Sequence, residues 1–197
     1  MAANEDLRVI KTHKALCQAF LELMNKKNFE NITVSELCDK AMVRRATFYK
    51  HFSDKYDFFC FFILQLQKKL ENECIDEIKD AEPYDYFTIS AKKLIYFLDE
   101  NEKMVQHLWE SNLMLTLLDT IGEQMFKNFS QNHITPLNIP QTELAFMVSF
   151  YTGGLMQTIR WWLSNKTLIT KDQLIDLCKN RIDIIKQATV VTQTNKS

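Results

Sequence analysis

The chain has 197 residues, of which 46% are hydrophobic and 25% charged, and it contains only three glycines and three prolines. This is the composition of an ordinary globular protein, long enough for one core or for a small module joined to a larger one. So few turn-forming residues argue against a many-stranded fold and favour helices.

The formal net charge of -1 hides an uneven distribution. Residues 1–55 hold ten Lys/Arg against seven Asp/Glu, whereas residues 56–197 hold fourteen against eighteen. A basic front end on an acidic body suits a protein that touches nucleic acid with one end only.

The five cysteines are widely spaced and never form a C-x-x-C pair, so we expect reduced core thiols and neither a disulfide framework nor a zinc site. The first residues lack the pattern of a signal peptide. The longest apolar run, FFCFFIL at 58–64, is far shorter than a bilayer span of about 20 residues. We therefore expect a cytoplasmic protein with no membrane partner.

Nothing in the sequence indicates catalysis. His107 and His133 have no carboxylates at metal or triad spacing, and there is no glycine-rich phosphate loop and no G-x-S-x-G motif. We expect no enzyme activity, no metal and no cofactor.

Three helices are predicted near the N-terminus. The spacing of Leu16, Phe20 and Leu23 predicts an amphipathic helix over 6–27. The TVSE sequence at 33–36 has the form of a capping box and predicts a short helix over 34–41. A third helix is predicted over 44–52, and the tight turn before it gives a helix-turn-helix plan.

A fourth, largely apolar helix is predicted to begin after Ser53 or Asp54, either of which can cap it. Pro136 and Pro140 indicate a loop. The predicted fold is all-α with about nine helices: a DNA-binding head at 1–55, a regulatory and dimerisation body at 56–190 and a frayed tail at 191–197. The remaining helices are predicted at about 85–100, 102–111, 112–131, 141–165 and 171–188.

The third helix offers a candidate reading surface. With Phe48 and Phe52 facing the core, Ala46 and Lys50 point outward. Small or hydroxyl side chains can meet a thymine methyl, lysine can donate to guanine, and flanking cations can bind phosphates. The alternative is a solvated basic face. The candidate DNA contacts are Thr33, Arg44, Arg45, Ala46, Thr47, Tyr49, Lys50, His51 and Lys55.

The stretch TVSELCDKAMVRRATFYKHFSDKYDFF at 33–59 resembles the DNA-binding signature of the TetR/AcrR family of bacterial regulators. Thr47, Phe48 and Tyr49 match the T-F-Y core, Phe52 matches the end of the recognition helix, and Lys55 matches the lysine of the fourth helix. The segment FYTGGLMQTIRWWL at 150–163 also resembles the penultimate helix of some low-GC Gram-positive members.

Two positions depart from the family pattern. Met42 stands where the family usually has a small residue or glycine, and would strain a turn that requires a positive φ. Arg44 stands where the family usually has a serine that caps the recognition helix, so it removes a cap and adds a cation.

The resemblance implies a homodimer whose heads bind a palindromic DNA operator. Segments 141–165 and 171–188 are the expected dimer elements, with Gly153, Gly154, Gln157 and Trp161 at the interface. A glycine pair inside a helix needs compensation, and close helix approach at the dimer seam would supply it. A pocket wall or a plain kink are the alternatives.

The resemblance also implies a body that binds an effector. The expected function is a repressor released from its operator by a small apolar or aromatic molecule. The alternative is a co-regulator of the same fold whose body binds a partner protein. Aromatic residues that could line the pocket, or could equally be core or dimer packing, are Trp109, Phe126, Phe146, Phe150, Tyr151 and Trp162.

Overall fold

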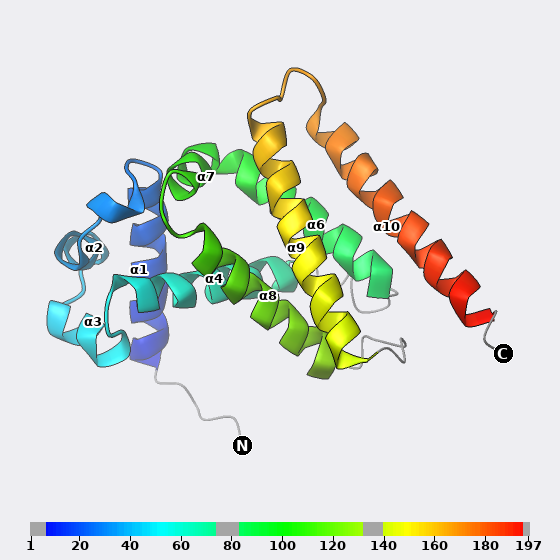
Figure 1. The fold of residues 1–197 in the computed structure, drawn as a ribbon. Coiled ribbons are helices and arrows are strands. Elements are labelled where there is room, and N and C mark those ends of the chain that lie inside the picture. The colour runs from blue at the N-terminus through cyan, green and yellow to red at the C-terminus, as the bar shows by residue number, and fades with distance from the viewer. Residues whose placement is uncertain (1–6, 74–82, 132–139, 195–197) are drawn as a thin grey trace. The chain divides into compact units, whose positions relative to one another are not determined.

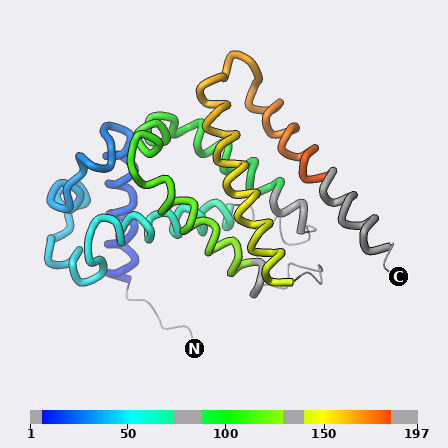
Figure 2. Tube along the Cα trace, in the orientation of Figure 1, coloured from blue at the N-terminus to red at the C-terminus, as the bar shows by residue number. Residues whose placement is uncertain are grey.

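The computed structural model describes the backbone of residues 7–73, 83–131 and 140–194, and side chains within the coloured part of Figure 2. The described residues contain nine α-helices and one short 3-10 helix, and no strand (Figure 1). This confirms the predicted all-α class. The α-helices are α1 (Leu7–Met24), α2 (Val34–Ala41), α3 (Arg45–His51), α4 (Lys55–Asn72), α6 (Pro83–Glu100), α7 (Glu102–Trp109), α8 (Met114–Gln131), α9 (Gln141–Leu163) and α10 (Lys171–Thr194); the 3-10 helix η1 is Phe29–Asn31.

The described chain forms two compact units. The first lies within Met1–Gln65 and Asn101–Leu117, and the second within Leu66–Glu100 and Leu118–Ser197. None of the helices in the described ranges is apolar over a sufficient length to cross a bilayer.

Aromatic rings fill the core of the first unit. Phe20 of α1 lies 5.4 Å from Phe58 and 4.9 Å from Phe62 of α4, measured between ring centroids. Phe48 of α3 lies 5.8 Å from Phe58, and Phe52 lies 5.1 Å from it. Close edge-to-face contacts of this kind add to the stabilisation from buried apolar area. They hold the short α3 against the longer α1 and α4.

The capping box at the start of α2 is half formed. Thr33 Oγ1 accepts a hydrogen bond from the Glu36 N–H at 3.2 Å, as the sequence predicts. The Glu36 carboxylate makes an ion pair with Lys27 Nζ at 2.5 Å instead of the predicted bond to the Thr33 N–H. At α4, Asp54 provides the cap, accepting from the Tyr56 and Asp57 N–H groups.

The turn between α2 and α3 carries the one positive φ among non-glycine residues of the described chain. Met42 adopts a left-handed conformation with φ 54° and ψ 38°. Its N–H donates to Asp39 O at 3.2 Å, and the Val43 N–H donates to Cys38 O at 2.9 Å. These two bonds form a Schellman motif, in which glycine is the usual residue at the position of Met42. The strain anticipated from the sequence is therefore present.

Met42→Gly is expected to raise the free energy of unfolding by about 1 kcal/mol, because glycine adopts this conformation without the steric cost of a Cβ. The Met42 side chain is 94% exposed, so little packing is lost. Urea denaturation measures the change. Met42→Ala keeps the Cβ and is the matched control, expected to bring no gain. Equal stabilisation by both variants would contradict this explanation.

In the second unit, α10 packs on α6, and the α9–α10 connection is fixed to α6 by ion pairs. Asp99 of α6 accepts from Lys166 Nζ at 2.8 Å and from Lys171 Nζ at 2.9 Å. Burial alone would raise the pKa of Asp99, but the hydrogen bonds and charges of the two lysines lower it overall. Trp162 Nε1 donates to Ile169 O at 3.2 Å within the same connection.

The four cysteines in the described ranges are free thiols. Cys38 is buried, and Cys17, Cys60 and Cys178 are partly buried. Burial raises the pKa of Cys17 to about 12, so this thiol stays protonated and unreactive at neutral pH. Cys74, His133 and the predicted loop around Pro136 lie outside the described residues.

Candidate nucleic-acid interface

Helix α3 has one exposed face, and its opposite face packs on the core through aromatic side chains. Phe48 is fully buried and Phe52 is nearly so, whereas Ala46 and Lys50 are exposed, which matches the predicted orientation of the helix. Tyr49 is 50% exposed, and its ring lies edge-on to Phe48 at 5.4 Å. Because the aromatic residues hold the helix, its outer side chains are presented on a rigid support.

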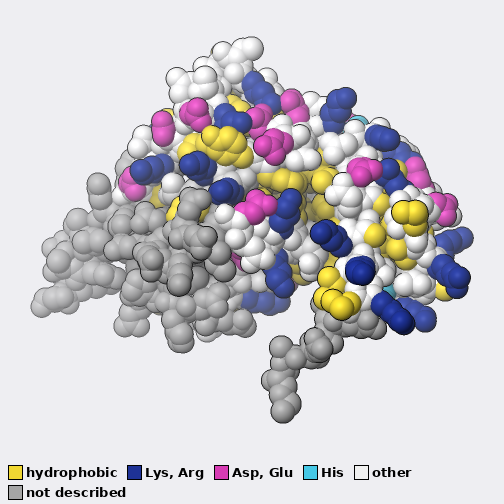
Figure 3. Space-filling view, turned by 180° about the vertical axis from the view of Figure 1, so that it is seen from behind, with side chains coloured by type: hydrophobic (Ala, Val, Ile, Leu, Met, Phe, Trp, Pro, Cys, Tyr) yellow, Lys and Arg dark blue, Asp and Glu magenta, His cyan; other side chains and the backbone are white. Residues whose placement is uncertain are grey.

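Basic side chains lie at both ends of this face. Arg44, Arg45 and His51 are all exposed. Arg44 occupies the N-cap position of α3 in an extended conformation, and its side chain makes no hydrogen bond to the start of the helix. In Figure 3, Lys and Arg side chains gather over the first unit, in the right-hand part of the view. A concentration of cations beside an exposed helix face attracts a polyanion.

Thr33 and Thr47 lie at the edges of this surface. Thr33 is exposed at the N-terminus of α2, where its hydroxyl is used in the cap, and Thr47 is half-buried on α3. A helix N-terminus offers unpaired N–H groups that can meet a phosphate.

Lys55 is placed differently from the sequence-based expectation of a free cation. Its Nζ donates to three backbone carbonyls, those of Phe29, Glu30 and Ile32, at 3.0 to 3.1 Å. It also lies 4.6 Å from the centroid of the Phe29 ring. An ammonium has three donors, and all three are engaged here. Lys55 thus ties α4 to the η1 segment, and burial lowers the pKa of its ammonium.

Lys55→Met is expected to lower the free energy of unfolding by about 2–3 kcal/mol, since hydrogen bonds to a charged donor are lost and carbonyls are left without it. Urea denaturation monitored by far-UV circular dichroism measures the loss. Lys50→Met removes an exposed cation from the neighbouring helix and is expected to change stability by less than about 0.5 kcal/mol. Wild-type stability in Lys55→Met, combined with weaker binding to every DNA sequence, would restore the phosphate-contact interpretation.

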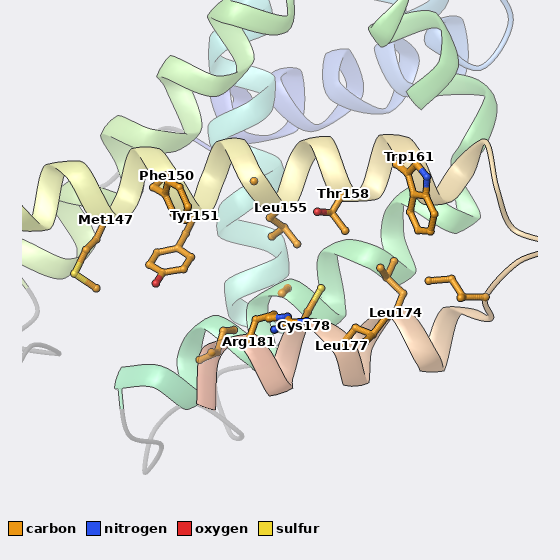
Figure 4. A pocket seen from close by; sticks show the side chains of 14 residues that line it. Met147, Phe150, Tyr151, Leu155, Thr158, Trp161, Leu174, Leu177, Cys178 and Arg181 are labelled. Atoms are coloured by element: carbon orange, nitrogen blue, oxygen red, sulfur yellow. The ribbon is translucent and has the colours of Figure 1, made fainter. Parts of the chain in front are cut away.

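Two hollows lie among the second unit's described residues. A groove of about 540 Å³ runs between α9 and α10, with Ala91 of α6 also lining it. Figure 4 shows Tyr151, Leu155 and Trp161 from α9 on one side and Leu174, Leu177, Cys178 and Arg181 from α10 on the other. A smaller cavity of about 120 Å³ lies among α4, α6, α8 and α9.

The aromatic residues predicted to form a pocket do not all line the same hollow. Phe150 and Tyr151 line the groove, and Tyr151 also lines the smaller cavity. Trp109, Phe126, Phe146 and Trp162 line neither of these two hollows. Each has a physical reason: Trp109 belongs to the first unit, Trp162 is 2% exposed and packs as core, Phe126 is half-buried elsewhere on α8, and Phe146 is 69% exposed.

The residues predicted for a dimer interface lie on α9. Gly154 and Trp161 line the groove, and Gly154 and Gln157 are exposed. A Cβ built on Gly153 or Gly154 would meet no atom within 4 Å outside its own helix backbone. No close approach among the residues that the structure describes therefore explains the glycine pair.

Two family models match the chain. Residues 17–59 match bacterial regulatory proteins of the tetR family, and residues 85–183 match a transcriptional regulator C-terminal region. The second match alone covers half of the chain. Both models describe transcriptional regulators, which are not enzymes.

Curated relatives agree with these matches over part of their length. An uncharacterised HTH-type transcriptional regulator, YxbF of Bacillus subtilis, is 34% identical over 99 residues, 50% of this chain and 23% of that protein. DhaS of Lactococcus lactis, an HTH-type transcriptional activator of the dhaKLM operon, is 29% identical over 100 residues, 51% of this chain and 50% of that protein. The alignments thus span half or less of these two relatives.

Solved structures share the fold. Lin0861 from Listeria innocua superposes with a TM-score of 0.66 at 20% identity, covering 94% of this chain and 96% of that one. A TetR regulator from Rhodococcus gives 0.64 at 15% identity, with 90% and 96% covered. With the helix-turn-helix geometry and the two family models, these comparisons establish that the chain belongs to the TetR family of bacterial transcriptional regulators.

Proposed function

We propose that the protein is a homodimeric repressor that binds a palindromic operator through α3 and is released by a small effector bound in its body. In this proposal residues 1–55 read DNA and residues 56–190 hold the effector and the dimer contacts. The observation that carries it is the exposed polar face of α3, mounted on the buried rings of Phe48 and Phe52.

The outer residues of α3 suit a major groove. Ala46 and Thr47 can contact a thymine methyl, Lys50 can donate to guanine acceptors, and the Tyr49 hydroxyl can reach either a base or a phosphate. Arg44 and Arg45, at the N-terminus of the helix, are suited to phosphates. Further contacts with the DNA phosphates are proposed for His51, Thr33 and the N–H groups at the start of α2.

The dimer surface is proposed on α9 and α10. Phe146, Phe150 and Trp161 of α9 and Leu177 of α10 are between 45% and 69% exposed. The rings of Phe146 and Phe150 stack with centroids 6.0 Å apart. An exposed apolar patch of this kind indicates a protein interface. A second copy packed against α9 and α10 would bury it and would also give the glycine pair a close helix neighbour.

A partner protein on the same apolar groove is the second candidate. The groove is open and lined mainly by apolar side chains, which suits a helix of another protein as well as a second copy. DhaS, one of the relatives, is named as an activator. Whether this protein represses or activates transcription is therefore tested together with this alternative. In vitro transcription from the identified promoter distinguishes the two signs: loss of transcript on adding the protein supports repression.

Fluorescence anisotropy with a duplex operator tests the reading surface. Lys50→Ala is expected to weaken binding by about 1–3 kcal/mol and to relax preference at one base position. Arg45→Ala should weaken binding to all sequences and reduce the salt slope by about one. Lys92→Ala, an exposed lysine of α6, is the charge-matched control. Unchanged affinity and preference in Lys50→Ala would contradict the proposed role of α3.

A further inference from the structure

The smaller cavity of the second unit is lined by two residues that carry an unpartnered polar atom. Gln67 Oε1 of α4 and Ser90 Oγ of α6 are both buried, and neither has a hydrogen-bond partner among the described residues. Both residues line the 120 Å³ cavity. Buried polar atoms in native proteins nearly always have a hydrogen-bond partner. Two such atoms without a partner at one cavity therefore indicate that a bound molecule supplies their hydrogen bonds.

The other polar groups that line this cavity are a carboxylate and a hydroxyl. Glu71, one turn along α4 from Gln67, also lines the cavity, and its carboxylate accepts from Asn128 Nδ2 at 2.7 Å. Thr152 adds a hydroxyl, which donates to Met125 Sδ at 3.6 Å. No lysine or arginine is among the described residues that line the cavity. A carboxylate or phosphate would therefore find no counter-charge there.

The rest of the wall is apolar and the space is small. Leu70, Leu94, Ile121 and Leu155 supply aliphatic side chains from four helices. A cavity of about 150 Å³ accommodates benzene, so a ligand of roughly six non-hydrogen atoms fits here. Large aromatic effectors and long acyl chains exceed this volume of about 120 Å³.

We propose that this cavity binds a small uncharged alcohol, whose hydroxyl lies between Gln67 and Ser90 and whose carbon chain lies against the aliphatic wall. The inference rests on the proposed function, because it names the chemical class of the body's effector. A hydroxyl is both a donor and an acceptor, so it can donate to Gln67 Oε1 and accept from the Ser90 hydroxyl. An ammonium group has donors only and cannot accept from the Ser90 hydroxyl, and the Glu71 carboxylate that lines the cavity already accepts from Asn128.

Methionine methyl NMR on the full chain tests binding at the site itself. Met125 and Met156 line the cavity, so their [13C]methyl signals report its occupancy. The probes are 1-butanol, butyrate and butylammonium, which share a four-carbon chain and differ in the polar group. We expect 1-butanol to shift both signals saturably, below the concentration at which the circular dichroism changes. Butyrate is expected to leave them in place.

Two variants connect the binding to the orphan atoms. Gln67→Leu and Ser90→Ala are expected to weaken 1-butanol binding by about tenfold, the effect of one lost hydrogen bond. Without ligand the same variants should melt at a higher temperature than the wild type, because an unsatisfied buried polar atom has been removed. Gln65→Leu removes an exposed amide from the same helix and is the matched control, with butanol affinity as in the wild type.

Three results would overturn the proposal: methyl signals that do not saturate with 1-butanol, wild-type affinity in Gln67→Leu and Ser90→Ala, or tighter binding of butyrate or butylammonium. In the first case the cavity holds water alone. Operator affinity measured in the same samples separates this inference from the proposed function. If 1-butanol saturates the cavity without changing operator affinity, the site stands and effector release is contradicted. If the protein binds DNA but none of the three probes binds in the cavity, the alcohol proposal is contradicted and the proposed DNA binding is kept.

Discussion

Phe48→Ala is expected to lower the free energy of unfolding by about 3–5 kcal/mol, the usual cost of removing a fully buried phenyl ring. The ring is 0% exposed and contacts Phe52 and Phe58, with centroids 5.3 and 5.8 Å away. Its loss leaves a cavity under α3, so the helix that carries the proposed DNA-contacting residues loses its packing against the core. Urea denaturation gives the stability, and operator titration gives the functional loss.

Tyr49→Ala is the matched control for this truncation, because Tyr49 is adjacent and half exposed. It should weaken DNA binding while stability falls by no more than about 1 kcal/mol. The two variants therefore separate support of the helix from contact with DNA. A Phe48→Ala protein as stable as the wild type would contradict the placement of this ring in the core.

If the protein is the proposed dimer, Phe150→Glu is expected to convert it into a monomer, because a charge would be placed in the centre of the proposed apolar interface. Operator affinity should then fall towards that of nonspecific binding, a loss of about a thousandfold or more. Sedimentation equilibrium measures the mass, and anisotropy measures the affinity. Leu115→Glu places the same charge at another exposed apolar residue, in the first unit, and should leave both unchanged. A Phe150→Glu protein that remains dimeric would place the interface elsewhere.

Local signals in the sequence predicted the helices well. The Thr33 cap predicts the start of α2, and the observed helix, Val34–Ala41, has the predicted bounds. The orientation of α3 follows from the four-residue spacing of Phe48 and Phe52, because that spacing puts both rings on one face. Helix ends were less accurate: α10 extends to Thr194, beyond the predicted 188, where no glycine or proline marks an end.

Long-range contacts were not predictable in the same way. By sequence, Lys55 resembles a phosphate ligand. Only the fold brings its ammonium to three carbonyls about 25 residues earlier in the chain. Asn101–Leu117 joins the first compact unit although it is far from the head in sequence.

The candidate pocket shows the same limit. Aromatic residues are frequent in cores, so their identity did not distinguish Trp162, which is core, from Tyr151, which lines both hollows. The orphan polar atoms of Gln67 and Ser90 were missed. Gln67 follows the apolar run at 58–64 and directly precedes Lys68 and Lys69, so its place in the sequence does not indicate that its amide is buried.

The measurement that tests the central claim most directly is affinity selection of fragmented genomic DNA by the purified full chain, at about 0.15 M salt to suppress purely electrostatic binding. We predict recovery of a palindromic site whose half-sites are about one helical turn apart, or a multiple of it. The Tyr49→Ala variant should not enrich the same site. Recovery of only nonspecific fragments by folded, dimeric protein would contradict sequence-specific reading by α3.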